Sequence, residues 1–168
     1  MEETLRASLK SQYHAALAML KDAVERCPGS LWAKSGHKNE SWRVAYHALF
    51  YAHFYGGRDE ASFEPWEHHR PDVQYLDPDG GPPGRFEPYT KAQVLSYWRF
   101  CDERIDAAID AMDLRSGESG FPWYPIPKLE HQIVNIRHIQ HHTAQLADRV
   151  RTAVDEGVDW VGARRPPR

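Results

Sequence analysis

Cysteine is scarce in this chain and occurs only at positions 27 and 101. A disulfide framework, which is typical of small secreted domains, needs more cysteines than this and is therefore excluded as the main support of the fold. Cys101 also falls on an apolar helical stripe, which favours a buried thiol over a cross-link. The low cysteine content thus indicates a reducing compartment.

Long apolar runs are absent as well, since no stretch reaches the roughly 18 apolar residues that a membrane-spanning helix requires. The first ten residues, MEETLRASLK, are charged, unlike a signal peptide. A chain of 168 residues fits one domain with its own hydrophobic core. We therefore expect a soluble, cytoplasmic protein with a single domain over residues 1–160 and no membrane partner.

Neither acidic nor basic residues form long blocks, and the formal net charge is −3 with histidine neutral. Proteins that bind nucleic acid usually carry a basic patch, so we expect no nucleic-acid partner. One short basic stretch, ARRPPR at 163–168, ends the sequence. We expect residues 161–168 to form a basic, flexible tail.

Strand-like alternation is also lacking, whereas four segments have a clear helical pattern. Apolar residues recur every three or four positions in 3–26 and 90–116, while 41–55 is apolar on nearly all sides, which indicates a central helix. Asn39 or Ser41 would cap this second helix, and Thr90 with Gln93 resembles a capping box for the third.

A fourth helix is predicted over 127–155, followed by Gly157 as its stop signal. Four such helices in one small domain predict an all-α fold of the four-helix-bundle type. The long segment 56–89 between the second and third helices holds six of the twelve prolines and five of the eleven glycines. Such a connection is typical of a crossover or a functional lid.

Histidine and aromatic residues are abundant instead, with ten histidines, six tryptophans and eight tyrosines. The stretch NIRHIQHHTAQL (135–146) contains three of the histidines. On a helical wheel, His138 and His142 lie one turn apart in a polar stripe. The other members of this stripe are His131, Asn135, Gln145 and Arg149. Two imidazoles four residues apart can bind one metal ion, but the pair alone favours a solvated or interfacial stripe over a metal site.

A third ligand from another helix would favour a metal site over a solvated stripe. His47 is the first candidate, because it lies in the apolar segment 41–55, where an imidazole without a partner would be costly. His53 lies in the same segment and competes with it, and the helical wheel does not choose between them. His68 and His69, in the proline-rich loop, are interpreted as solvated loop residues.

The ending HIQHHTAQL (138–146) resembles the H-x-x-H-H-x-[GA]-Q-L close of the DinB-like (YfiT-like) superfamily of bacterial four-helix metalloproteins. The segment AYHALFYAHFY resembles the histidine-bearing second helix of that family. The resemblance implies that His47, His138 and His142 bind a divalent metal, zinc or nickel, and that His141 is a neighbour that is not a ligand. Threonine and alanine stand at positions 143 and 144, where arginine and glycine are frequent in the family.

Two functions follow from this resemblance. Characterised DinB-like proteins include metal-dependent transferases or isomerases that use low-molecular-weight thiols, and relatives often form homodimers. The first hypothesis is therefore a thiol-dependent transferase or a hydrolase that acts on a small molecule. The alternative is a non-catalytic module in which the metal is structural. No general base is assigned, because the histidine stripe contains no carboxylate.

Other metal chemistries lack their motifs. The sequence contains no HExxH, no cysteine-pair zinc motif and no Glu-x-x-His pair in a predicted helix. The sequence therefore lacks the signatures of zinc proteases, cysteine-rich zinc domains and di-iron bundles, and it does not predict membership of these classes.

Overall fold

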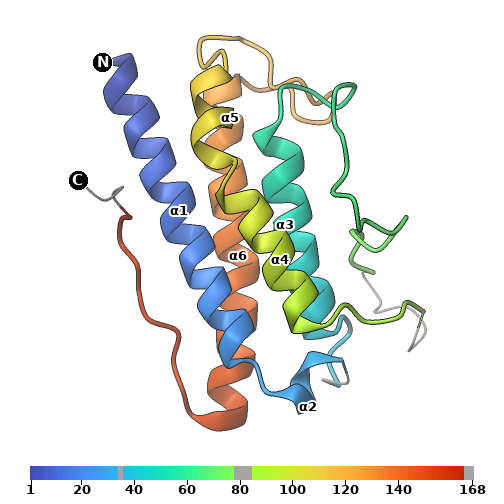
Figure 1. Cartoon of the computed structure of the whole chain (residues 1–168). Helices are drawn as coiled ribbons and strands as arrows, with labels where there is room; N and C mark the ends of the chain where they lie inside the picture. The colour runs from blue at the N-terminus through green and yellow to red at the C-terminus, as the bar shows by residue number, and fades with distance from the viewer. Residues whose placement is uncertain (34–35, 78–84, 165–168) are drawn as a thin grey trace.

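The computed structural model describes residues 1–33, 36–77 and 85–164, and all regular structure in these ranges is helical (Figure 1). The helices are α1 (Glu2–Arg26), α2 (Gly29–Trp32), α3 (Ser41–Gly56), α4 (Lys91–Asp102), α5 (Ile105–Ala111) and α6 (Lys128–Val154). The described part of the chain contains no strand. The predicted all-α class is thus confirmed, and no described helix is long and apolar enough to cross a membrane.

The helix α3 occupies the centre of the molecule, as its apolar sequence predicted. It packs most extensively against α6 and also contacts α1, α2, α4 and α5. Its side chains Trp42, Tyr46 and Leu49 are almost completely inaccessible to solvent. Burial of a large apolar side chain contributes about 1.5–3 kcal/mol, so α3 is a main source of folding free energy.

The helix α1 closes the core through its apolar stripe. Leu9, Tyr13, Leu20 and Val24 from this stripe are all buried. The stripe packs mainly on α6, with further contacts to α4 and α5. The four-residue helix α2, which the sequence did not predict, follows α1 directly and buries Trp32.

The predicted third helix, 90–116, is wrong as a single element. The capping box of Thr90 and Gln93 is present, but α4 ends at Asp102, α5 begins at Ile105 and α5 ends at Ala111. At the break, the amide of Arg104 bonds to the carbonyl of Cys101 at 3.1 Å, a tighter pattern than in an α-helix. The apolar period did not reveal the break because Cys101 and Ile105 face the core on both sides of it.

Two predicted helix boundaries also differ. The N-cap of α3 is Glu40, without a side-chain cap, instead of Asn39 or Ser41. The last helix stops at Val154, and its C-cap is Asp155 in the left-handed conformation (φ 55°) instead of the predicted Gly157. Aspartate tolerates this conformation better than most residues, which allows the chain to turn before the glycine.

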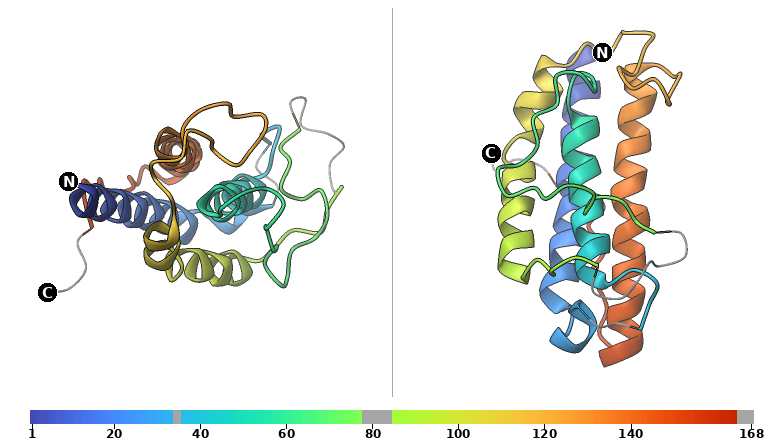
Figure 2. Two further views of the ribbon diagram at one scale, coloured as in Figure 1. Left: turned by 90° about the horizontal axis from the view of Figure 1, so that it is seen from above. Right: turned by 90° about the vertical axis from the view of Figure 1, so that its right-hand side faces the viewer.

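The described parts of the connection between α3 and α4 lie along the outer side of α3 (Figure 2). Trp66, Val73 and Tyr89 from this connection are buried, so it belongs to the core. It is anchored by Arg43 of α3, whose guanidinium pairs with the carboxylate of Asp77 at 2.6 Å. Most of the sequence DPDGGPPG lies outside the described residues, as do residues 165–168 of the predicted tail.

Candidate metal site

Most of the polar stripe of α6 faces the interior of the molecule, and Gln145 near its C-terminal end is exposed. His131, Gln132, Asn135 and His142 are buried, whereas Ile133 on another side of the helix is 49% exposed. Gln132 and Asn135 donate hydrogen bonds to the backbone carbonyls of Tyr55 and Ala52 in α3. The stripe therefore forms a hydrogen-bonded seam between α6 and α3, and the histidines lie along that seam.

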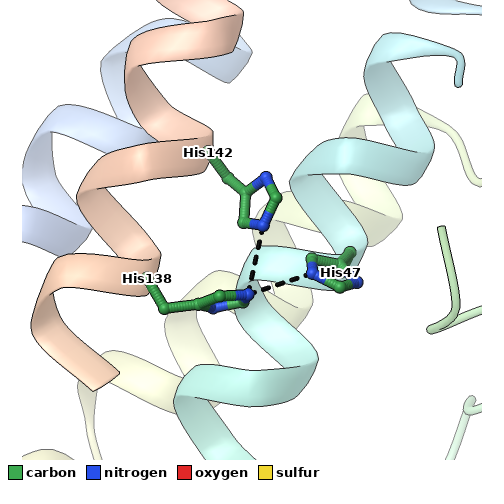
Figure 3. Close-up of side chains that lie close together, drawn as sticks. All are labelled: His47, His138 and His142. Carbon is green, nitrogen blue, oxygen red and sulfur yellow. Dashed lines mark hydrogen bonds between the residues drawn. The ribbon is translucent and has the colours of Figure 1, made fainter. Parts of the chain in front are cut away.

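Three histidines meet in this seam (Figure 3). The Nε2 atom of His138 lies 3.0 Å from Nε2 of His47 and 3.1 Å from Nε2 of His142. One ligand atom from each residue falls within 4.8 Å of the other two, so the group could hold a metal ion. His47 comes from α3 and the other two from α6, so a metal here would join the two helices.

In two of these rings, a hydrogen bond on the side away from the group fixes which nitrogen carries the imidazole proton. Nδ1 of His47 lies 2.6 Å from the backbone carbonyl of Gln74, and Nδ1 of His142 lies 2.8 Å from Oε1 of Gln145. Both oxygens accept only, so each ring carries its proton on Nδ1. The Nε2 atoms of His47 and His142 therefore present lone pairs to the centre of the group, as metal ligands do.

His138 cannot satisfy both of its neighbours. A neutral imidazole has one N–H, so at most one of the two short Nε2 contacts is a hydrogen bond. Its other nitrogen, Nδ1, is buried without a hydrogen-bond partner. Either three lone pairs converge, or the Nε2–H of His138 bonds one neighbour and leaves the lone pair of the other without a donor; both arrangements are unfavourable without a cation between the rings.

The protonation state of the group also suits a metal. Burial lowers the pKa of His47 and of His138 to about 3, and it lowers the pKa of His142 to about 4. The rings are therefore neutral at pH 7, the form in which histidine binds a metal. In a tetrahedral site with metal–nitrogen bonds of about 2.0 Å, ligand nitrogens lie roughly 3.3 Å apart, close to the two short distances observed here.

The choice between His47 and His53 is decided by geometry. His53 points to α4, where its Nδ1 lies 3.2 Å from the hydroxyl of Tyr97, and it does not belong to the group of three. The neighbour His141 is exposed and touches Gln145 at 3.3 Å.

The loop histidines are also outside the group. His69 is partly buried, with its Nδ1 2.7 Å from the hydroxyl of Tyr46, and His68 is exposed beside Glu67. The interpretation of His68 as a solvated loop residue agrees with this position, whereas His69 packs against the core.

The backbone carbonyl of Gln74 is the one site component that the sequence did not suggest. A carbonyl carries no residue-specific signal, and Gln74 lies 27 residues from His47 in the chain. Arg43 holds this part of the loop, because its guanidinium bonds the carbonyl of Tyr75 as well as Asp77. Arg43 precedes His47 by one helical turn, and this spacing is the only feature of the sequence that is related to the way the loop is held.

Few groups near the three histidines could transfer a proton. The ring of Tyr51 packs against His47 and His138, with ring centres 4.8 and 5.4 Å apart. Within the described residues, no fourth histidine, cysteine or carboxylate joins the group. The best-formed cavities over the described residues have volumes of about 370–780 Å³ and are lined by other residues than these histidines.

Comparison with known proteins yielded no significant match to a family model, a curated protein or a solved structure. The functional argument therefore depends on the geometry of the three histidines.

Proposed function

We propose that this protein binds a divalent metal, zinc or nickel, through His47, His138 and His142. The observation that carries the proposal is the convergence of three neutral imidazoles on one point with too few protons to bond each other. Zinc and nickel suit imidazole nitrogen ligands.

We also propose that the fold is the DinB-like four-helix bundle that the sequence resembles. In it, α1, α3 and α6 would each form one arm, α4 with α5 would form the fourth, and the connection of α3 to α4 would be the crossover. Support comes from the matching motif residues and from their position on two neighbouring helices. Homodimerisation is part of the same proposal, and light scattering on the purified protein tests it.

The metal site supports an enzyme best, namely a transferase that uses a low-molecular-weight thiol, or a hydrolase. Three protein ligands leave a coordination position for a small molecule, and bound zinc would supply either a water with a lowered pKa or a site for a thiolate. Gln145 and the Gln74 carbonyl would hold two ligand rings in place. Tyr51, whose ring packs against His47 and His138, is the candidate for positioning a substrate.

One observation favours a structural metal as the second candidate. The segment that carries Gln74 packs directly on His47, with the Gln74 carbonyl 2.6 Å from Nδ1 of that ring. In this case the metal would only tie α3 to α6. Both cysteines are free and buried, which supports the predicted cytoplasmic location. This location is compatible with either role of the metal.

Metal analysis of purified protein tests the site. We expect about one zinc or nickel per chain in the natural sequence and in His141→Ala, whose ring is exposed on the same helix. His138→Ala should lose the metal, because it removes the central ring of the group. Equal metal content in His138→Ala and His141→Ala would refute the site.

Turnover measurements separate the two roles. Metal-loaded protein is mixed with bacillithiol, mycothiol or glutathione and electrophilic acceptors, and consumption of the thiol is followed. Metal-dependent turnover that is lost in His138→Ala supports the transferase. A bound metal that gives no turnover, but raises the free energy of unfolding, supports the structural role.

A further inference from the structure

His53, the histidine outside the metal group, lines a cavity of about 740 Å³. The cavity lies between the end of α3, the break between α4 and α5, and the segment that follows α3. Its walls include the apolar and aromatic side chains of Phe63, Phe100 and Ile105. A mostly apolar cavity of this size with a few polar groups is the usual form of a small-molecule site.

The contacts of His53 fix its tautomer. The hydroxyl of Tyr97 is part of a fully buried side chain, and its one hydrogen-bond partner in the described chain is Nδ1 of His53 at 3.2 Å. The phenol proton has no other acceptor among the described residues, so Tyr97 donates to Nδ1. The imidazole proton then resides on Nε2, which is not among the buried atoms that lack a hydrogen-bond partner, and His53 lines the cavity, so this N–H is available to a ligand there.

Arg104 supplies a positive charge to the same cavity. Its guanidinium stacks on the ring of Phe100, 3.6 Å from the ring centre, and donates to the Phe100 carbonyl at 3.3 Å. Within the described residues, no carboxylate lies within ion-pair distance of Arg104. The guanidinium is therefore held in place, and most of its N–H donors are free to bond a ligand.

The remaining charged groups in the wall are on the segment after α3. Arg58 pairs with Asp59 at 2.8 Å, and Glu67 lies 3.4 Å from His68. Glu64 also lines the cavity and is exposed. Arg104 is thus the one cation of the wall without a carboxylate partner in the described chain.

We propose that this cavity binds a small organic acid, with its carboxylate held by Arg104 and by the Nε2–H of His53. Its apolar body would pack against Phe63 and Phe100, whose rings also flank the imidazole at 4.9 and 5.0 Å. This site is independent of the metal, since His53 contacts α4 and the metal group lies between α3 and α6.

Titration calorimetry with three matched probes tests the proposal: phenylacetate, 2-phenylethanol and phenethylamine. Phenylacetate should bind at least about ten-fold more tightly than the alcohol, because a charge-assisted bond to Arg104 requires the carboxylate. Arg104→Gln should remove this preference, and His53→Phe should weaken phenylacetate binding several-fold. Arg99→Gln is the matched control, since Arg99 is exposed on α4 and does not line the cavity.

As a folding control, the thermal unfolding curve of each variant is first compared with that of the natural sequence, and only variants with the same curve are used. Equal affinity for all three probes, no binding of phenylacetate at millimolar concentration, or retained preference in Arg104→Gln would each overturn the proposal. Phenylacetate binding that disappears in His138→Ala would assign the ligand to the metal group and overturn it as well. Binding unchanged by that substitution supports a separate site.

Discussion

His131 shows how one residue can lower the stability of a core. Its side chain is completely buried, and neither ring nitrogen has a hydrogen-bond partner. The rings of Tyr55, Phe121 and Tyr124 surround it at 4.7–5.0 Å between ring centres. Aromatic packing stabilises the ring as an apolar body, but its polar atoms lose their bonds to water on folding.

We predict that His131→Leu raises the free energy of unfolding by about 1 kcal/mol at pH 7, because it removes a buried polar group without a partner. Burial lowers the pKa of His131 to about 4 from 6.5, so the folded state loses stability relative to the unfolded state as pH falls below 6.5. The gain from the substitution should therefore grow between pH 6.5 and pH 4. Urea denaturation at several pH values measures it, and a destabilised variant at pH 7 would contradict the prediction.

At the scale of elements, one histidine joins three helices. His14 of α1 bonds the carboxylates of Asp102 at the end of α4 and Asp106 in α5, at 2.7 and 3.1 Å. The break between α4 and α5 lies between these two aspartates. The imidazole thus connects α1 to both halves of the segment that the sequence predicted as one helix.

The hydrogen bond to Asp102, with help from Asp106, raises the pKa of His14 above 6.5. The stabilisation is then complete below pH 6.5 and is lost as pH rises through the raised pKa. We predict that the free energy of unfolding of the natural sequence decreases over this range by up to about 1 kcal/mol, and that His14→Gln lacks the decrease. His68→Gln, in an exposed pair with Glu67, is the control and should retain it.

The ion pair of Arg43 and Asp77, which anchors the connection between α3 and α4, offers a second test at this scale. The side chain of Arg43 is 3% exposed and that of Asp77 is 21% exposed, so Asp77→Asn leaves an almost buried guanidinium without its counter-charge. We expect a loss of about 2 kcal/mol, less than for a fully buried pair. Metal affinity should fall by roughly ten-fold, because the Gln74 carbonyl belongs to the same loop. Asp72→Asn, an exposed change of equal charge, should alter neither quantity in denaturation and metal-competition assays.

At the scale of the whole molecule, the proposed metal would join the two helices with the most extensive contact, α3 and α6. A ligand that binds only the folded state stabilises it by about 2.7 kcal/mol at a hundred-fold excess over its Kd. We predict that zinc or nickel raises Tm by roughly 5–10 °C and that a chelator reverses this rise. Calorimetry on His138→Ala should show no metal-dependent change, whereas His141→Ala should behave as the natural sequence; a shift in both would place the metal elsewhere.

The sequence by itself determined the three long helices α1, α3 and α6, the start of α4, and the pairing of His138 with His142. Both depend on local spacing, because residues three or four apart share one side of a helix whatever surrounds it. For the same reason the capping box at Thr90 was predictable, whereas the break after Asp102 was not. The apolar stripe is continuous across that break, and the polar contacts to His14 that accompany it come from a distant helix.

Only the tertiary structure decided which histidine completes the group. Because α3 is apolar on almost every side, its sequence does not indicate which face meets α6. The helical wheel therefore did not choose between His47 and His53, and His47 was preferred only for its apolar surroundings and through the family resemblance. The packing also turned most of the polar stripe of α6 inward and brought the Gln74 carbonyl to His47. These features depend on contacts between distant segments, which local periodicity cannot encode.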